Sequence, residues 1–140
     1  MPQFHLESFL PYELAQLSEQ VSREFSALYR ERFGISIPEW RVMANLSQAG
    51  TLSVREIHTR AGMDKSKVSR AAARLETAGY VAKTEDASDR RLVALSLTEA
   101  GRGLIEEITP LARAYEAQVL DRLGAGAAPF RDGIRRLLDG

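Results

Sequence analysis

The sequence predicts a mainly α-helical fold with one small β-hairpin, and three observations support this. Apolar side chains recur every three to four residues over most of the 140-residue chain, as on one face of an α-helix. The pattern changes between residues 80 and 97, where Val93, Leu95 and Leu97 alternate with smaller side chains as in a half-buried strand. Glycine or proline stands at most borders between these segments, as expected where one element ends and the next begins.

The first long helix is expected over residues 10–33, where apolar side chains form a stripe along one face. They are Leu10, Leu14, Leu17, Val21, Phe25 and Leu28. Gly34 ends this stripe, because glycine commonly terminates helices. A second helix is expected from about Pro38, a residue suited to the first turn of a helix, to Gly50.

Two shorter helices are expected next. Ser53 and Glu56 have the spacing of a capping box, so a short helix begins there and ends by Gly62. Asp64 can cap the following helix, which is expected over residues 65–77.

The β-hairpin and a long helix complete the predicted elements. Residues 80–83 are a plausible partner for the strand at 93–97, and the polar stretch 84–91 joins the two strands as a long hairpin tip. Thr98 opens the last long helix. Residues 124–129 are expected to form a loop before a short terminal helix that carries Phe130, Ile134 and Leu137.

A helix, a turn, a second helix and a β-hairpin in succession form a winged helix-turn-helix. This lobe is expected over residues 36–98 of a single chain, 1–140, with dimerisation helices in 8–34 and 99–140. The apolar stripes of these flanking helices are too long for one small lobe to bury, so a homodimer is expected. The alternative is a monomer in which the two helices pack only on each other.

The second helix of the helix-turn-helix has one apolar face and one polar face. Val68, Ala71, Ala72 and Leu75 form the apolar face. The remaining surface carries hydroxyl and cationic side chains that can contact DNA bases and phosphates, namely Lys65, Ser66, Lys67, Ser69, Arg70 and Arg74. An ordinary solvated helix face is the alternative interpretation.

The predicted hairpin tip favours DNA binding. Arg90 and Arg91 lie where a wing can reach the minor groove, whose negative potential attracts arginine, and Asp89 can orient Arg91. The chain has no net charge, with 19 basic and 19 acidic residues, but residues 55–91 hold nine Lys or Arg against six Asp or Glu. Double-stranded DNA is therefore the expected partner.

Over nearly its whole length the sequence resembles the MarR family of bacterial transcription regulators. The motifs that carry the resemblance are Pro38–Arg41, Lys67–Arg70, Leu75–Val81, Asp89–Arg91 and Leu97–Gly101. The resemblance implies a homodimer on a palindromic operator, with Ser66, Lys67, Ser69 and Arg70 in the major groove. It also implies that Asp89 and Arg91 fill the wing's Asp-x-Arg positions, with Arg91 entering the minor groove.

The resemblance further implies a small, often aromatic or phenolic, acid that binds between the dimerisation helices and the lobe and releases DNA. The residues available near this junction are Phe25, Tyr29, Trp40, Arg41, Met43 and Tyr115. An aromatic and methionine-lined cavity with one arginine suits an aromatic carboxylate or its thioester. Alternatively, the aromatic residues belong to the core and Arg41 forms a structural ion pair.

Other classes of protein find little support. The chain has no cysteine and only His5 and His58, so neither a metal nor another cofactor is expected. It lacks a glycine-rich phosphate loop and a Ser/His/Asp arrangement, so an enzyme is not expected. No apolar run is long enough to span a bilayer and no signal-peptide pattern is present, so a cytoplasmic protein with no membrane partner is expected. A sequence-specific repressor is therefore predicted, with a winged-helix protein-interaction module as the alternative.

Overall fold

The computed structural model describes residues 3–85 and 93–140. Its elements are a 3-10 turn at Leu6–Ser8, α1 (Leu10–Phe33), α2 (Ile37–Ala49), β1 (Thr51–Ser53), α3 (Val54–Ala61), α4 (Lys65–Thr77), β2 (Val81–Glu85), β3 (Val93–Leu97), α5 (Glu99–Leu123), a 3-10 turn at Gly124–Gly126 and α6 (Ala127–Asp139). The predicted mainly helical fold with a small β-wing is confirmed.

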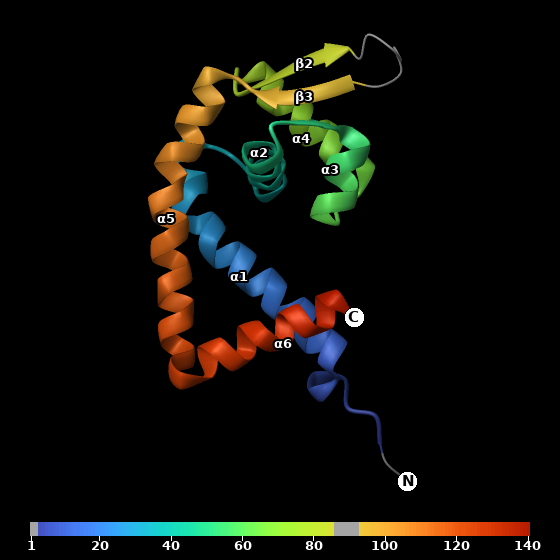
Figure 1. Cartoon of the computed structure of the whole chain (residues 1–140), viewed down its shortest axis with the longest axis vertical. Helices are drawn as coiled ribbons and strands as arrows, with labels where there is room; N and C mark the ends of the chain where they lie inside the picture. Colours follow the sequence, from blue (N-terminus) through green and yellow to red (C-terminus); the bar gives the residue numbers. More distant parts are fainter. Residues whose placement is uncertain (1–2, 86–92) are drawn as a thin grey trace.

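The helices and strands form a lobe from which α1, α5 and α6 extend (Figure 1). α2, α3, α4 and the hairpin make the lobe, and α5 runs from the end of β3 along one side of it. α1 crosses below the lobe, and α6 turns back from the far end of α5. This arrangement separates a compact lobe from the helices that flank it in the sequence.

The sheet has three antiparallel strands in the order β1-β3-β2. Val81 pairs with Leu97 and Glu85 with Val93, so β2 extends two residues beyond the predicted 80–83. β1, in which Leu52 pairs with Leu95, was not predicted, because three residues are too few to show a strand period.

Local signals set most helix ends. The capping box is confirmed: Ser53 Oγ accepts from the Glu56 backbone N–H at 3.1 Å, and a carboxylate oxygen of Glu56 accepts from the Ser53 backbone N–H at 3.0 Å. Gly34 and Gly62 end α1 and α3 with φ of 71° and 64°, a left-handed conformation that glycine adopts without strain. Asp64 precedes α4, but its side chain makes no capping hydrogen bond, so that prediction is wrong. Because this end of α4 is exposed, water can satisfy its free N–H groups.

The C-terminal helix is longer than predicted. α6 begins at Ala127 and includes Pro129, so the expected loop over 124–129 is wrong; only a short 3-10 turn separates α5 from α6. Pro129 lies in the first turn of the helix, where the N–H that proline lacks would have no intrahelical partner.

One apolar core joins the lobe to the C-terminal part of α1 and the N-terminal half of α5, and the rest of these two helices lies outside it. The first buried residue of α1 is Ser26 and the last buried residue of α5 is Ile108, while α6 buries none. Gly101, in the first turn of α5, lies against the carbonyl of Tyr80, and a Cβ atom there would come closer than 3.0 Å to that oxygen. Among the described residues, no helix is long and apolar enough to cross a membrane.

Candidate nucleic-acid interface and adjoining cavity

α4 separates its buried and exposed residues as the sequence predicts. Val68, Ala71, Ala72 and Leu75 are at most 1% exposed, so they anchor the helix in the lobe. All six predicted DNA-contacting residues of this helix are exposed: Lys65, Ser66, Lys67, Ser69, Arg70 and Arg74. The outer surface of α4 therefore offers hydroxyl, ammonium and guanidinium groups together.

Arg74 differs from the other cations of α4 because it reaches a neighbouring helix. Its Nη1 lies 3.7 Å from the Glu39 carboxylate on α2. No salt bridge between described residues involves Lys65, Lys67 or Arg70. The N-terminal half of α4 therefore has cations that are unpaired within the described part of the chain, while Arg74 is tethered.

The turn between α3 and α4 is held by a histidine. His58 Nδ1 contacts the backbone carbonyl of Met63, which can only accept, so Nδ1–H is the donor. Gly62 supplies the left-handed residue between them. This hydrogen bond therefore links α3 to the turn that leads into α4.

The base of the wing is fixed to α4 and α5. Thr98 donates to Gly79 O through its hydroxyl at 2.6 Å and to Tyr80 O through its backbone N–H at 3.0 Å. Lys83 on β2 pairs with Glu76 on α4 at 3.6 Å, a partly exposed pair of small energetic value. The predicted wing-tip residues Asp89, Arg90 and Arg91 lie outside the described residues.

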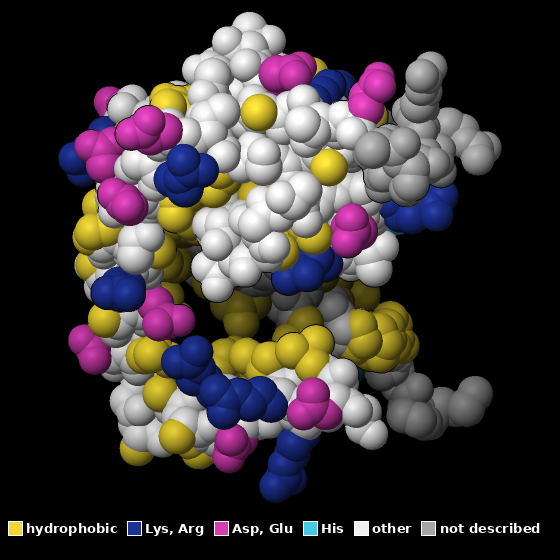
Figure 2. Space-filling view, turned by 45° about the horizontal axis from the view of Figure 1, so that its top comes forward, with side chains coloured by type: hydrophobic (Ala, Val, Ile, Leu, Met, Phe, Trp, Pro, Cys, Tyr) yellow, Lys and Arg dark blue, Asp and Glu magenta, His cyan; other side chains and the backbone are white. Residues whose placement is uncertain are grey.

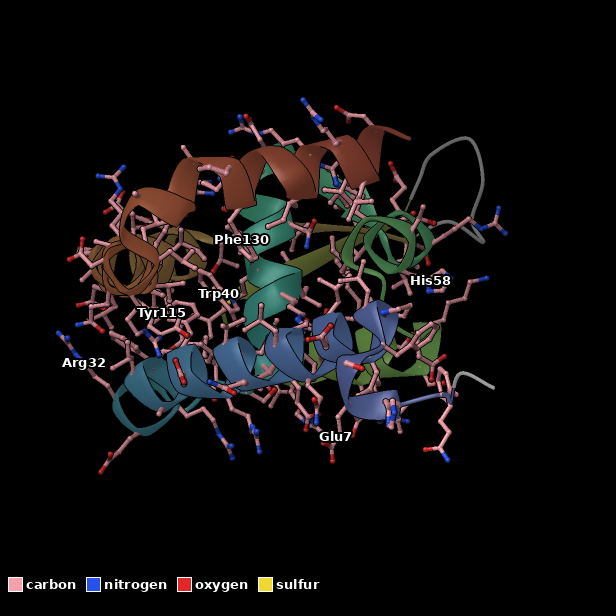
Figure 3. The ribbon with its side chains drawn as sticks, turned by 90° about the horizontal axis from the view of Figure 1, so that it is seen from below. Glu7, Arg32, Trp40, His58, Tyr115 and Phe130 are labelled. Carbon is pink, nitrogen blue, oxygen red and sulfur yellow. The ribbon has the colours of Figure 1, made fainter. Side chains whose placement is uncertain are left out.

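A cavity of about 200 Å³ lies between α1, α2 and α5. Five of the six predicted ligand residues line it: Phe25, Tyr29, Trp40, Arg41 and Tyr115. Trp40 and Tyr115, labelled in Figure 3, lie in the region enclosed by these helices. Met43 is not among the lining residues; it is fully buried in the core of the lobe. Val21, Ser22 and Ile37 complete the lining, and no sequence motif marks them as ligand-binding residues.

Aromatic rings build the cavity wall. The Phe25 ring lies edge-on to Tyr29 at 5.0 Å and to Trp40 at 5.3 Å, and it stacks on Tyr115 at 5.7 Å between ring centroids. Burial raises the pKa of Tyr29 to about 12, so its phenol is neutral. Arg41 adds a cation, and its Nη2 donates to Ser22 Oγ at 3.1 Å. The cavity thus combines flat apolar walls with one guanidinium.

A polar cluster joins α1 and α5 beside this cavity. Tyr115 Oη donates to Glu24 Oε1 at 2.8 Å, and Arg122 Nη2 donates to the same oxygen at 3.1 Å. The hydrogen bond from Tyr115 is the main cause that lowers the pKa of Glu24, and burial with this contact raises the pKa of Tyr115. Sequence reasoning missed Glu24 and Arg122, because 98 residues separate the two.

An apolar groove of about 900 Å³ lies where α1, α5 and α6 converge. Its apolar lining consists of Leu14, Leu17, Val21, Val119, Leu123, Phe130, Ile134, Leu137 and Leu138, with Tyr115 at one side. Leu137 and Leu138 are 67% and 80% exposed. Figure 2 shows hydrophobic side chains gathered on the helical region below the lobe, along the hollow that separates this region from the lobe.

The chain is similar to proteins of one family. A model of the MarR family matches residues 33–92. The chain is 32% identical over 125 residues to the HTH-type transcriptional repressor Rv2887 of Mycobacterium tuberculosis, a match that spans 89% of this chain and 84% of that protein. It resembles the solved structure of the MarR family transcriptional regulator SPO1453 from Silicibacter pomeroyi, with a TM-score of 0.84 and 31% identity over 98% of each chain. It also resembles NadR in complex with 4-hydroxyphenylacetate, with a TM-score of 0.79 and 25% identity over 99% of this chain and 97% of that one.

Proposed function

This chain belongs to the MarR family of transcription regulators, and from that premise we propose that it is a repressor that binds a palindromic operator as a homodimer. The observation that supports this most is the exposed surface of α4. Lys65, Lys67 and Arg70 stand there beside Ser66 and Ser69 on a helix anchored by its opposite face. A helix so presented fits the major groove, where arginine can bond guanine through two hydrogen bonds and lysine neutralises phosphate.

The wing is proposed to contact the adjacent minor groove. Two arginines in the predicted hairpin tip would suit the negative potential of a narrow minor groove, with Arg91 inserted, Arg90 beside it and Asp89 orienting Arg91. This part of the proposal rests on the sequence. The direct test is an affinity titration of Arg91→Ala on an operator duplex, with Arg113→Ala on α5 as the control. We expect weaker binding for Arg91→Ala alone; equal affinities for both variants would remove Arg91 from the interface.

A winged-helix module that binds an acidic protein is the second candidate, favoured only by the cations of α4. The two functions differ in their dependence on salt. Each phosphate contact releases counterions, so log K for duplex DNA falls with log salt at a slope of about 0.9 per phosphate neutralised. A slope of several units would support the DNA-binding role, whereas no measurable binding to duplex DNA at low salt would favour the protein-interaction module.

The homodimer is proposed from the apolar groove. The apolar side chains of the groove lie outside the core, on α1, α5 and α6, and a partner is needed to shield them from water. A second copy of the same chain offers the same apolar surface. Leu137→Asp introduces a charge at an exposed site, so it should leave the protomer folded while preventing association. Sedimentation velocity should give a monomer for this variant and a dimer for the wild type. The control Arg136→Asp, outside the groove lining, should remain dimeric; a monomeric wild type would refute this part of the proposal.

The effector is proposed to be a single-ring aromatic acid or its thioester in the cavity between α1, α2 and α5. Flat aromatic walls and the small volume suit one ring, and a carboxylate can take the Arg41 guanidinium that now bonds Ser22. Similarity to NadR, solved with 4-hydroxyphenylacetate, supports this class of ligand. DNA is released if the acid favours a spacing of the two lobes that no longer fits both half-sites.

A thermal-shift titration tests the effector with 4-hydroxyphenylacetate and a panel of related aromatic acids and thioesters. We expect at least one compound to raise the Tm of the wild type and to release DNA in a gel shift. Arg41→Gln should lose this response, whereas Arg30→Gln, exposed on α1 and outside the cavity lining, should keep it. A compound that stabilises Arg41→Gln as well as the wild type would contradict the role of the arginine.

A further inference from the structure

Glu39 is a buried carboxylate beside the candidate DNA-binding helix. Among the described residues it is the only buried acidic residue, with 8% of the residue and 11% of its side chain exposed. A carboxylate removed from water requires compensating partners. Its polar partners are Ser36 at the start of α2 and Arg74 on α4.

The start of α2 holds Glu39 in place. Ser36 Oγ donates to Glu39 Oε2 at 2.7 Å, and the Glu39 backbone N–H donates to Ser36 Oγ at 3.3 Å. Glu39 also lies in the first turn of α2, where the helix dipole favours a negative charge. These contacts within α2 therefore fix the position of the carboxylate beside α4.

Arg74 is the exposed partner of this pair. Its side chain is 62% exposed, and its Nη1 lies 3.7 Å from Glu39 Oε2. Arg74 follows Arg70 by four residues, so both leave α4 on the same side, one turn apart. If Arg70 faces the operator, the side chain of Arg74 is long enough to contact the phosphate backbone once its guanidinium is released from Glu39.

We propose that Glu39 withholds Arg74 from the DNA phosphates and thereby limits sequence-independent binding by α4. The proposal rests on the DNA-binding role of α4 given above. Moving Arg74 to a phosphate would leave a buried carboxylate without its counter-charge, so Arg74 stays with α2. Fewer phosphate contacts lower the affinity for random DNA, which competes with the operator at every other position of a genome.

Glu39→Gln tests this on a labelled random-sequence duplex, titrated with the full-length chain at several salt concentrations. Glutamine keeps the shape and can still bond Ser36, but it releases Arg74. We expect the affinity at low salt to rise about three- to tenfold and the salt slope to steepen by about one unit, the signature of one added phosphate contact. In the Arg74→Ala background, Glu39→Gln should leave both quantities unchanged.

Glu107→Gln is the matched control, because it makes the same change in net charge at an exposed site of α5. A purely structural role for Glu39 predicts the opposite sign, since a loosened α4 binds DNA less well. Unchanged or weaker binding by Glu39→Gln, a gain that persists without Arg74, or an equal gain in Glu107→Gln would each overturn the proposal. If the wild type binds no duplex at low salt, the DNA-binding role itself fails and the proposal falls with it.

Discussion

The close approach of α5 to the β-hairpin at Gly101 can be tested by adding one methyl group, in the variant Gly101→Ala. A Cβ at this position would meet the Tyr80 carbonyl oxygen at a distance that real Cβ atoms essentially never show, and it would lie 3.2 Å from Leu97 Cδ2. The obstacle is backbone, which rotation of a side chain cannot relieve. The same carbonyl accepts the hydrogen bond from the Thr98 N–H, so a shift there also disturbs the start of α5.

The magnitude follows from two opposed effects of Gly101→Ala. Overpacking a tight site costs about 1–3 kcal/mol, and a backbone clash belongs at the upper end of that range. Alanine in place of glycine within a helix returns about 1 kcal/mol. The net expectation is a loss of about 2 kcal/mol in the free energy of unfolding, or a Tm lower by about 4–8 °C for a chain of this size.

Gly103→Ala provides the comparison, because an added Cβ there meets nothing within 4 Å. It gains the helical preference without the clash, so its Tm should rise by about 2–4 °C. Thermal unfolding followed by circular dichroism at one protein concentration measures both variants. A Gly101→Ala chain as stable as the wild type would refute the close approach of α5 to the hairpin.

Three further predictions concern other parts of the molecule. Ser53→Ala removes the capping-box acceptor of α3 and should lower the free energy of unfolding by about 1 kcal/mol, measured by urea denaturation; no change would show that the box is dispensable. Tyr115→Phe removes the main hydrogen bond that holds the pKa of Glu24 below its ordinary 4.5. Its contribution to stability is fully present above pH 4.5 and is lost as the pH falls through the lowered pKa of Glu24 in the folded chain. The Tm of the variant should therefore decline less on acidification than the Tm of the wild type. Arg70→Ala should weaken binding to an operator more than to random duplexes in parallel anisotropy titrations, since a base contact specifies sequence; equal losses would reassign Arg70 to a phosphate.

The sequence predicts the elements whose signals are local. The stripe that ends at Gly34, the Ser53–Glu56 box and the alternation of Val93, Leu95 and Leu97 each act within a few residues, and the structure confirms all three. The end of α5 shows the limit of such signals. Gly124 and Gly126 suggest a loop, yet helix resumes at Ala127, because proline is tolerated in the first helical turn.

The site is harder to predict where it depends on distant residues. Met43 is a residue type that often lines cavities, but it is fully buried in the core and does not line the cavity. The contacts of Glu39 with Arg74 and of Glu24 with Tyr115 each join residues that periodicity cannot pair. Exposure of the α4 surface, by contrast, follows directly from the spacing of Val68, Ala71, Ala72 and Leu75.

We propose that two copies of this chain bind an inverted repeat in double-stranded DNA. Repeated selection of bound duplexes from a random-sequence library with the wild-type chain tests it directly, followed by measuring the stoichiometry of the complex. We predict enrichment of an inverted repeat whose half-site centres lie about one helical turn apart, or a multiple of it, bound by two chains. No enriched sequence, or a single unrepeated site bound by one chain, would contradict the claim.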